Sequence, residues 1–153
     1  MKLEAFLQER GSGYEKHAHP LAYTAQELAN AEHVSGYLVA KPVVVKGAAG
    51  YTMCVLAAPK RVDLKRVADV LGEPSVRLAS ESEMTSLFPD CEIGAEPPFG
   101  SQYGVQTFVD ETMTAVQQIV FRAGTHARTV KMSCADYLRL EKAKVGAFVI
   151  ENE

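Results

Sequence analysis

Two consecutive apolar runs constrain the fold of this chain more than any other feature of its sequence. Residues 36–47, GYLVAKPVVVKG, and residues 51–58, YTMCVLAA, are rich in β-branched and other apolar side chains. Runs of this kind are typical of β-strands, and the short segment GAAG at residues 47–50 is a turn signal between them. The two runs therefore predict an antiparallel β-hairpin.

Further elements are predicted before and after the hairpin. The spacing of Leu3, Phe6 and Leu7 predicts a helix that ends at Gly11, and the capping-box pattern TAQE at residues 24–27 predicts a second one. Three later helices are predicted from their candidate N-cap residues, which are Asp63, Ser80 and Ser133. Apolar segments predict five more strands, at residues 76–79, 105–110, 117–124, 127–132 and 145–151. A short turn at residues 110–113 is expected to join the second and third of these strands.

Helices and strands mix along the chain without regular βαβ alternation. This order predicts an α/β fold of the mixed α+β kind, with a mostly antiparallel, partly open, barrel-like sheet surrounded by helices. The length of 153 residues suits one domain that spans residues 1–153.

The sequence predicts a cytoplasmic protein with reduced cysteines. No apolar run approaches the length of a membrane span, and Glu4 places an acidic charge too early for a signal peptide. Cys54, Cys91 and Cys134 are far apart and form no CxxC pair. A disulfide framework and a thiolate zinc site are therefore not expected.

Charge is unevenly distributed along the chain. The net charge of -3 argues against a general nucleic-acid binder. Residues 41–66 nevertheless hold six basic residues and one acidic residue, and residues 73–96 hold six acidic residues and one basic residue. Two interpretations stay open: a pair of solvated faces, or a local basic edge that contacts a short part of a phosphate-bearing partner.

Lys41 interrupts the first apolar run, with Leu38-Val39-Ala40 before it and Val43-Val44-Val45 after Pro42. A lysine in a half-buried strand loses hydration, which is unfavourable unless an acceptor or an opposite charge compensates its charge. Pro42 removes a backbone donor from the ladder, which indicates a strand edge or a bulge, and bulges are frequent near active sites. The alternative is a lysine on the solvent face of the strand.

The segment CEIGAEPPFG, residues 91–100, has no helical or strand periodicity. It is longer than an ordinary turn, and its prolines make it stiff and poor in backbone donors. Loops of this kind often shape a site.

Histidines and Asp110 are the remaining candidates. His126 follows a predicted strand and Gly124, and a surface-loop histidine is the alternative interpretation. His17 and His19 share one face of an extended segment, which permits a metal pair, but no HExxH motif or cysteine pair supplies further ligands. Asp110 is best explained as a turn former. The chain has no GxSxG, P-loop or GxGxxG motif, so serine and cysteine nucleophiles have no local support.

Three motifs taken together are more specific than any of them alone: AKPVVV with Lys41, GAEPPFG at residues 94–100, and AGTHARTVKM with His126. In this order and spacing the chain resembles the YbaK family of free-standing aminoacyl-tRNA deacylases, which is related to the editing domain inserted in bacterial prolyl-tRNA synthetases. The resemblance covers nearly the whole chain, and HPLAYTAQELA, which begins at His19, is similar to the N-terminal region of the family.

The resemblance implies a mixed α/β fold with a partly open barrel and hydrolysis of the ester that joins a wrong amino acid to its tRNA. It implies no metal and no cofactor. It implies the 3′ aminoacyl end of a mischarged tRNA as the partner, with an aminoacyl-tRNA synthetase as a further one, and no membrane. The oligomeric state stays open.

The same resemblance assigns the site residues. The family's lysine falls on Lys41, its glycine-proline loop begins at Gly94, and its histidine falls on His126. The residues expected to contact the substrate are His19, Pro42, Ala95, Glu96, Pro97, Pro98 and Gly100.

Pro42 and Glu96 depart from the family pattern, which often has a small polar residue and a small or apolar residue at these positions. They bear on the choice of amino acid, which the family suggests is small: alanine, serine, cysteine or threonine.

An aminoacyl ester is already activated, so the site must orient a water and stabilise the charge that develops on the carbonyl oxygen. The N–H groups of Gly94 and Ala95 are expected to stabilise that charge. We expect Lys41 to contact a phosphate of the terminal adenosine or the substrate carbonyl. His126 is expected to orient the water or the substrate amino group, because imidazole exchanges a proton near neutral pH.

Two other classes of function stay open. A non-catalytic module would bind a tRNA end, a synthetase or an amino-acid-like ligand on the same scaffold. A metal-dependent hydrolase would use His17 and His19, and it would lose activity with a chelator.

Overall fold

The computed structural model describes residues 2–11, 13–18, 28 and 34–150. His19 and the predicted capping box at residues 24–27 lie outside them. No helix in this described part is both long and apolar enough to cross a membrane.

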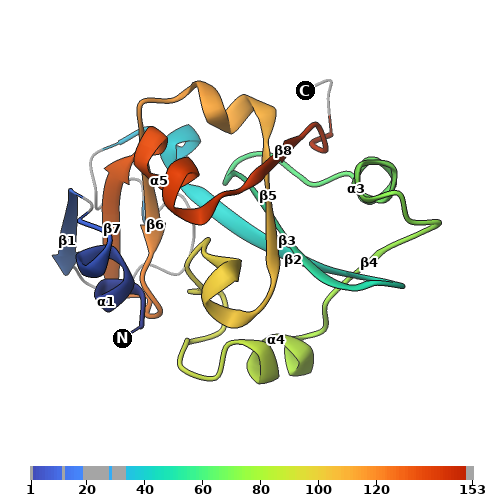
Figure 1. The fold of residues 1–153 in the computed structure, drawn as a ribbon, viewed down its shortest axis with the longest axis horizontal. Coiled ribbons are helices and arrows are strands. Elements are labelled where there is room, and N and C mark those ends of the chain that lie inside the picture. Colours follow the sequence, from blue (N-terminus) through green and yellow to red (C-terminus); the bar gives the residue numbers. More distant parts are fainter. Residues whose placement is uncertain (1, 12, 19–27, 29–33, 151–153) are drawn as a thin grey trace.

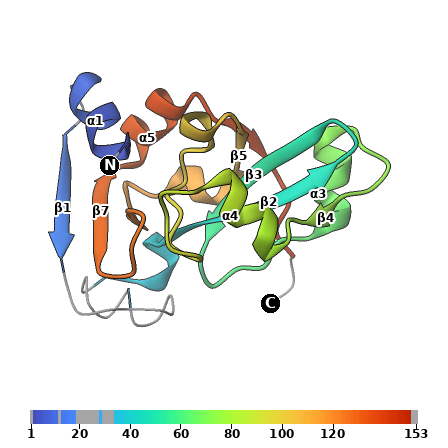
Figure 2. The same cartoon turned by 90° about the horizontal axis from the view of Figure 1, so that it is seen from below.

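Two β-sheets form the framework of the molecule (Figure 1). The three-stranded sheet has the order β1 (Tyr14–Ala18), β7 (Arg128–Ser133), β6 (Gln118–Arg122), and both pairings are antiparallel. The five-stranded sheet has the order β4 (Arg77–Leu78), β2 (Ala40–Gly47), β3 (Gly50–Ala57), β5 (Gln106–Asp110), β8 (Lys144–Gly146). Its β4–β2 and β2–β3 pairings are antiparallel, and its β3–β5 and β5–β8 pairings are parallel. Figure 2 shows β1 and β7 at one end of the molecule and the β2–β3 hairpin, β4 and α3 (Leu64–Leu71) at the other.

The predicted hairpin is confirmed. β2 and β3 pair without interruption from Ala40 opposite Ala57 to Gly47 opposite Gly50. β4 pairs only with Val45 and Lys46, so β2 has a single described neighbour at Pro42. Pro42 therefore occupies a local strand edge, where its missing N–H leaves no gap in the ladder, and the unbroken register excludes a bulge there.

The predicted helices in the described residues are confirmed together with their caps. They are α1 (Lys2–Glu9), α3, α4 (Glu81–Leu87) and α5 (Cys134–Glu141). The side chains of Asp63, Ser80 and Ser133 accept hydrogen bonds from the first turns of the last three. The strands at residues 76–79 and 127–132 are confirmed as β4 and β7.

The predicted fold class is confirmed, since helices and mostly antiparallel strands mix and the strands do not close into a barrel. The strands divide between two sheets, however, rather than forming one. Residues 105–110 and 117–124 become β5 and β6, which lie in different sheets. The expected turn between them is the 3-10 helix η3 (Glu111–Ala115). Asp110 caps the start of η3, which connects β5 to β6. Its carboxylate accepts the N–H of Thr112 at 3.1 Å and the N–H of Phe148 at 3.0 Å.

Two predicted strands are shorter than expected. The first hairpin strand begins only at Ala40, because Ser35 caps the short 3-10 helix η1 (Gly36–Leu38). The closing strand is confined to β8 and an isolated bridge between Val62 and Val149.

The main core lies between the two sheets. Phe99 stands at its centre, with ring centroids 5.6 Å from Phe121, 5.1 Å from Tyr137 and 5.7 Å from Phe6. Edge-on aromatic contacts of this kind add stability beyond the apolar area that they bury. A parallel bridge between Val39 and Val120 connects the two sheets beside this core.

Candidate active site

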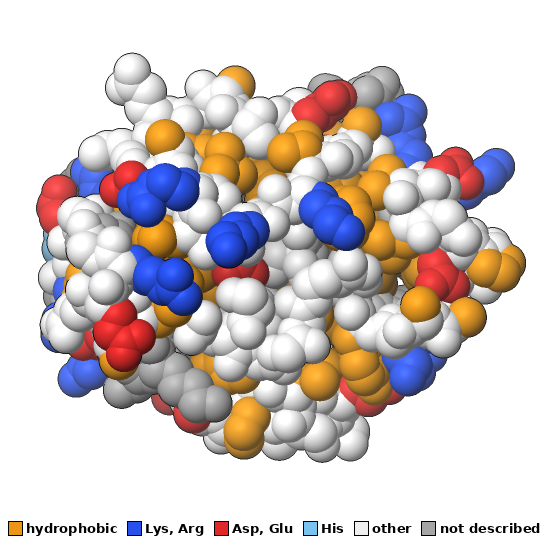
Figure 3. All heavy atoms as spheres, in the orientation of Figure 1, with side chains coloured by type: hydrophobic (Ala, Val, Ile, Leu, Met, Phe, Trp, Pro, Cys, Tyr) orange, Lys and Arg blue, Asp and Glu red, His pale blue; other side chains and the backbone are white. Residues whose placement is uncertain are grey.

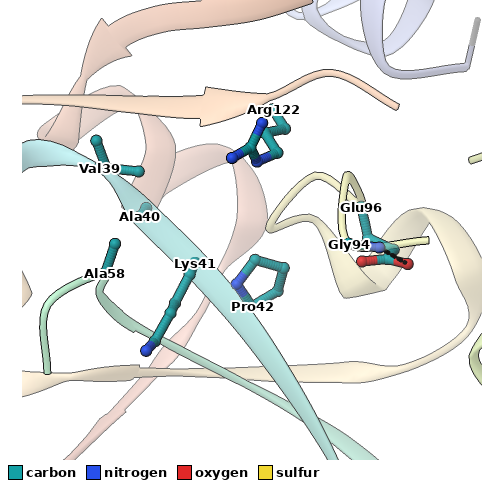
Figure 4. A pocket seen from close by; sticks show the side chains of 8 residues that line it. All are labelled: Val39, Ala40, Lys41, Pro42, Ala58, Gly94, Glu96 and Arg122. Atoms are coloured by element: carbon teal, nitrogen blue, oxygen red, sulfur yellow. Dashed lines mark hydrogen bonds between the residues drawn. The ribbon is translucent and has the colours of Figure 1, made fainter. Parts of the chain in front are cut away.

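A cavity of about 170 Å³ opens beside this bridge, where the two sheets meet (Figure 4). Its walls come from the start of β2, the residue after β3, the loop of residues 91–99 and the end of β6. The lining residues are Val39, Ala40, Lys41, Pro42, Ala58, Gly94, Glu96 and Arg122. Four of the ten residues assigned from the sequence therefore meet in one place: Lys41, Pro42, Gly94 and Glu96.

Lys41 lies on β2 opposite Leu56 and is half-buried. Burial lowers the pKa of Lys41, and the nearby charge of Arg61 lowers it further. The pocket therefore holds a partly dehydrated cation, which an anionic or strongly dipolar ligand would stabilise. This position favours the functional interpretation of Lys41 over a lysine on the solvent face.

Gly94 turns the loop into the pocket with a left-handed backbone, φ 84°. A side chain at this φ is strained, which explains the glycine. The N–H of Gly94 donates to Glu96 Oε2 at 3.2 Å, and the N–H of Ala95 donates to the carbonyl oxygen of Glu92 at 3.0 Å. Both N–H groups that were expected to stabilise the substrate oxygen are thus engaged within the loop in this structure.

Glu96 places a carboxylate in the wall of the pocket although the residue is only 5% exposed. Burial raises the pKa of Glu96, and hydrogen bonds from its own backbone and from Gly94, with the nearby His126, partly offset the rise. The resemblance placed Glu96 among the residues expected to contact the substrate, and in the structure it lines the same cavity as Lys41.

His126 is 8% exposed, so the surface-loop alternative was wrong. Its backbone N–H donates to Glu92 Oε1 at 2.8 Å, and its Nε2 lies 2.9 Å from the carbonyl oxygen of Ile93. Its ring also packs against Gly94, where a Cβ would lie 3.5 Å from His126 Cε1. His126 does not line the pocket, and its contacts support the loop from behind.

The rest of the loop is anchored below the pocket. Ala95, Pro97, Pro98 and Gly100 are buried and do not line the cavity. The hydroxyl of Tyr137 donates to the carbonyl oxygen of Pro98 at 2.6 Å. A Cβ at Gly100 would lie 2.6 Å from the carbonyl oxygen of Val105, so the close backbone approach requires glycine.

Glu141 of α5 ties down the end of this loop. It is 5% exposed and accepts hydrogen bonds from the N–H of Ser101 at 3.0 Å, the hydroxyl of Ser101 at 2.6 Å and the hydroxyl of Thr107 at 2.6 Å. Thr107 in turn accepts the N–H of Gly100 at 3.1 Å. Burial raises the pKa of Glu141, and these donors partly compensate. The sequence analysis missed this anchor, since nothing local distinguishes a carboxylate in the last turn of a helix.

Arg122 is the second residue that the sequence analysis missed. It ends β6 and lines the pocket together with Lys41, from the other sheet. Figure 4 shows the two side chains on different walls, with β2 between them. Its signal in the sequence was its place near the end of a predicted strand, two residues before Gly124.

The basic segment of residues 41–66 does not form one edge. Lys41 lies near the start of β2, close to Arg61, whereas Lys46 lies near the end of the strand with its Nζ 4.5 Å from the ring centre of Tyr51. Arg66 pairs with Asp63 at 3.7 Å. Figure 3 shows basic and acidic side chains interspersed over one face of the molecule. Of the six basic residues in the segment, Lys41 alone lines the pocket.

Among the described residues, neither the possible metal ligands nor Cys54 and Cys91 form a reactive centre. The described residues contain no group of three or more His, Cys, Asp or Glu placed to hold a metal. His17 lies 3.2 Å from Glu15 on the surface, and its proposed partner His19 is outside the described part. Burial raises the pKa of Cys54 to about 12 and that of Cys91 to about 11, so both thiols are neutral near pH 7.

Comparisons with known proteins place this geometry in context. Residues 19–140, which include every residue that lines the pocket, match the family model described as the aminoacyl-tRNA editing domain. The chain is 26% identical over 152 residues to the "Multifunctional Ser/Thr-tRNA deacylase ProXp-y" of Escherichia coli (strain K12), and the match covers 96% of this chain and 90% of that protein.

Two solved structures share the fold. The hypothetical protein APE2540 superposes with a TM-score of 0.90 at 22% identity, over 98% of this chain and 100% of that one. A protein described as a candidate trans-editing enzyme for prolyl tRNA synthetase superposes with a TM-score of 0.88 at 24% identity, over 98% of this chain and 96% of that one.

Proposed function

Because this chain belongs to the family of aminoacyl-tRNA editing domains, we propose that it is a trans-editing deacylase that removes a small, wrong amino acid from the 3′ end of a mischarged tRNA. The oxygen of a water attacks the ester carbonyl carbon, and the bond from that carbon to the ribose oxygen breaks. The ribose oxygen takes up a proton, and the products are a free amino acid and an uncharged tRNA.

The single observation that carries this proposal is the set of charges in the pocket. Lys41 and Arg122 bring two cationic side chains to one cavity, and Glu96 brings one carboxylate. The end of an aminoacyl-tRNA carries the complementary set: a phosphate, an ester dipole and an ammonium group. Low local polarity strengthens each of these interactions relative to water.

Lys41 is the residue that we assign to the developing charge or to the terminal phosphate. Its ammonium group is compact and partly dehydrated, which suits a single oxygen ligand. Arg122 approaches from β6, and its planar guanidinium suits a phosphate. Both contacts would hold the ester in place while water attacks, which lowers the entropic part of the barrier.

The size of the cavity supports a small amino acid. A volume of about 170 Å³ accommodates a side chain of a few atoms but not a nucleotide, which would lie outside the mouth. This agrees with the expectation of alanine, serine, cysteine or threonine. The name of the Escherichia coli relative, which refers to serine and threonine, supports the same range. Cytoplasmic location and contact with a synthetase belong to the same proposal.

The test is amino-acid release measured beside binding. Purified protein is incubated with tRNAs that carry labelled alanine, serine, cysteine or threonine, with and without EDTA, and both release and retention of tRNA on the protein are recorded. Catalytic, chelator-insensitive release supports the proposal. Saturable binding without release would instead support a binding module, and loss of release in EDTA would support a metal-dependent hydrolase.

A further inference from the structure

Glu96 is a carboxylate built into the wall of an otherwise cationic and apolar pocket. We propose that this carboxylate binds the α-ammonium group of the aminoacyl ester, and that a free amine is therefore required for hydrolysis. The inference rests on the proposed function and adds a specificity-determining residue to it.

Burial of the Glu96 carboxylate removes it from water. This desolvation costs free energy unless cations or several hydrogen-bond donors compensate the charge. Within the described part of the chain, Glu96 takes part in none of the ion pairs, and its side-chain hydrogen bonds come from neutral backbone N–H groups, its own and that of Gly94, with His126 nearby. Burial accordingly raises the pKa of Glu96, since the present donors do not fully compensate the lost hydration. A ligand that carries a cation would stabilise the charged carboxylate on binding.

The two carboxylate oxygens of Glu96 point in different directions. One oxygen of Glu96 accepts the N–H of Gly94, and in Figure 4 the other lies on the side of the loop that faces Pro42. Lys41 lies beyond Pro42 in the same view. An aminoacyl ester that lies between these residues would place its positive end at Glu96 and its negative groups at Lys41 and Arg122.

The covalent geometry of the substrate keeps its ammonium group close to its ester carbonyl. The ammonium nitrogen is separated from the ester carbonyl carbon by the α-carbon alone. A group that holds the ammonium beside Gly94 therefore also brings the carbonyl oxygen near the backbone of Gly94. In this structure the N–H of Gly94 donates to Glu96. When the carboxylate turns to the ammonium, this N–H becomes available to the carbonyl oxygen, so amine recognition and oxyanion stabilisation are coupled.

This coupling excludes a definite class of substrate. An aminoacyl-tRNA whose amine is acylated has no positive charge and carries extra bulk at the same point. It would neither satisfy Glu96 nor free the N–H of Gly94. Glu96 would thus separate free aminoacyl esters from N-acylated ones.

The experiment compares each mischarged tRNA with its N-acetylated form. For wild-type protein we expect release from the free-amine ester to exceed release from the N-acetyl ester, after correction for buffer hydrolysis, by about 10–100-fold, the range for losing a charged hydrogen bond. Glu96→Gln keeps the shape and an acceptor for Gly94 but removes the charge. It should lose most of this ratio by slowing only the free-amine reaction. Glu9→Gln, at an exposed carboxylate of α1 that does not line the pocket, should keep the ratio. Equal ratios in wild type and Glu96→Gln overturn the inference.

A binding arm separates this inference from the proposed function. The probe is 3′-deoxy-3′-(L-serylamino)adenosine, whose amide is not hydrolysed, together with its N-acetyl derivative, and Kd is measured by calorimetry. Tighter binding of the free amine to wild type, with the preference lost in Glu96→Gln, supports the inference even if no tRNA is deacylated. Equal binding of the two probes, or no binding of either, overturns it even if deacylation occurs.

Discussion

His126 and Ile93 are joined by a hydrogen bond of 2.9 Å between the imidazole Nε2 and the backbone carbonyl oxygen. A carbonyl oxygen only accepts, so Nε2 carries the proton and donates. The bond fixes the residue directly before Gly94, which forms the wall of the pocket. The histidine therefore holds the loop in position, and this changes what its removal should do.

Replacement of His126 by alanine should lower both stability and activity. The substitution leaves the partly buried carbonyl oxygen of Ile93 without its donor, which costs about 0.5–1.5 kcal/mol, and it leaves a space behind Gly94. Thermal unfolding and kcat should both fall, whereas an exposed catalytic helper would affect kcat alone. His126→Gln, which retains an N–H donor, should recover part of both. His17→Ala, on the surface strand β1, is the matched control and should change neither.

Replacement of Lys41 should separate activity from folding. Lys41→Ala is expected to reduce kcat/KM by about 10²–10³, the effect of losing one well-placed charge contact, while Tm stays nearly unchanged. Burial lowers the pKa of Lys41, so its charge does not add to the stability of the folded state at neutral pH. Lys41→Arg should not restore full activity, because a planar fork does not replace a compact ammonium. A large loss of Tm in Lys41→Ala would indicate a structural role.

Replacement of Glu96 by glutamine should stabilise the protein at neutral pH. Because burial raises the pKa of Glu96, the folded state holds this proton more tightly than the unfolded state. The associated stability is fully present below the unfolded pKa of about 4.3 and is lost as the pH rises through the raised folded pKa. Glutamine does not ionise, so it avoids this loss of stability at high pH, and its side-chain oxygen still accepts the N–H of Gly94. The Tm of Glu96→Gln should exceed that of wild type at pH 7–8, and the difference should shrink as the pH falls toward 4. A lower Tm across this range would contradict the direction of the shift.

Replacement of Glu141 tests the anchor below the loop. Glu141→Ala removes the acceptor of three hydrogen bonds from Ser101 and Thr107 and leaves partly buried donors unpaired. A loss of about 3–5 kcal/mol in the free energy of unfolding is expected, as for breaking a buried charged network. Tyr137→Phe removes one neutral hydrogen bond to Pro98 and should cost about 1 kcal/mol. Chemical denaturation of both variants gives the comparison, and equal losses would contradict it.

Local sequence signals predicted the elements of the fold well. Asp63, Ser80 and Ser133 each cap the helix that follows, and the two apolar runs around residues 47–50 form a hairpin. The division into two sheets was not predictable in the same way. β5 pairs in parallel with β3, and this choice depends on contacts between segments far apart in the chain.

The site was predicted in part for the same reason. Lys41 and Gly94 could be recognised from their motifs, and they share the pocket. Arg122 comes from the other sheet, and only the packing of the two sheets places it beside them. The burial of His126 was missed because the loop that covers it lies more than thirty residues earlier in the sequence.

We propose above that this pocket hydrolyses aminoacyl esters of tRNA in trans. The most direct measurement is the single-turnover rate of labelled amino-acid release from mischarged tRNAs, with micromolar wild-type protein, Lys41→Ala and a buffer control. We expect release well above buffer hydrolysis for at least one small amino acid, and a fall of about 10²–10³ in rate in Lys41→Ala. Release at the buffer rate from every small aminoacyl-tRNA, or full activity in Lys41→Ala, would contradict it.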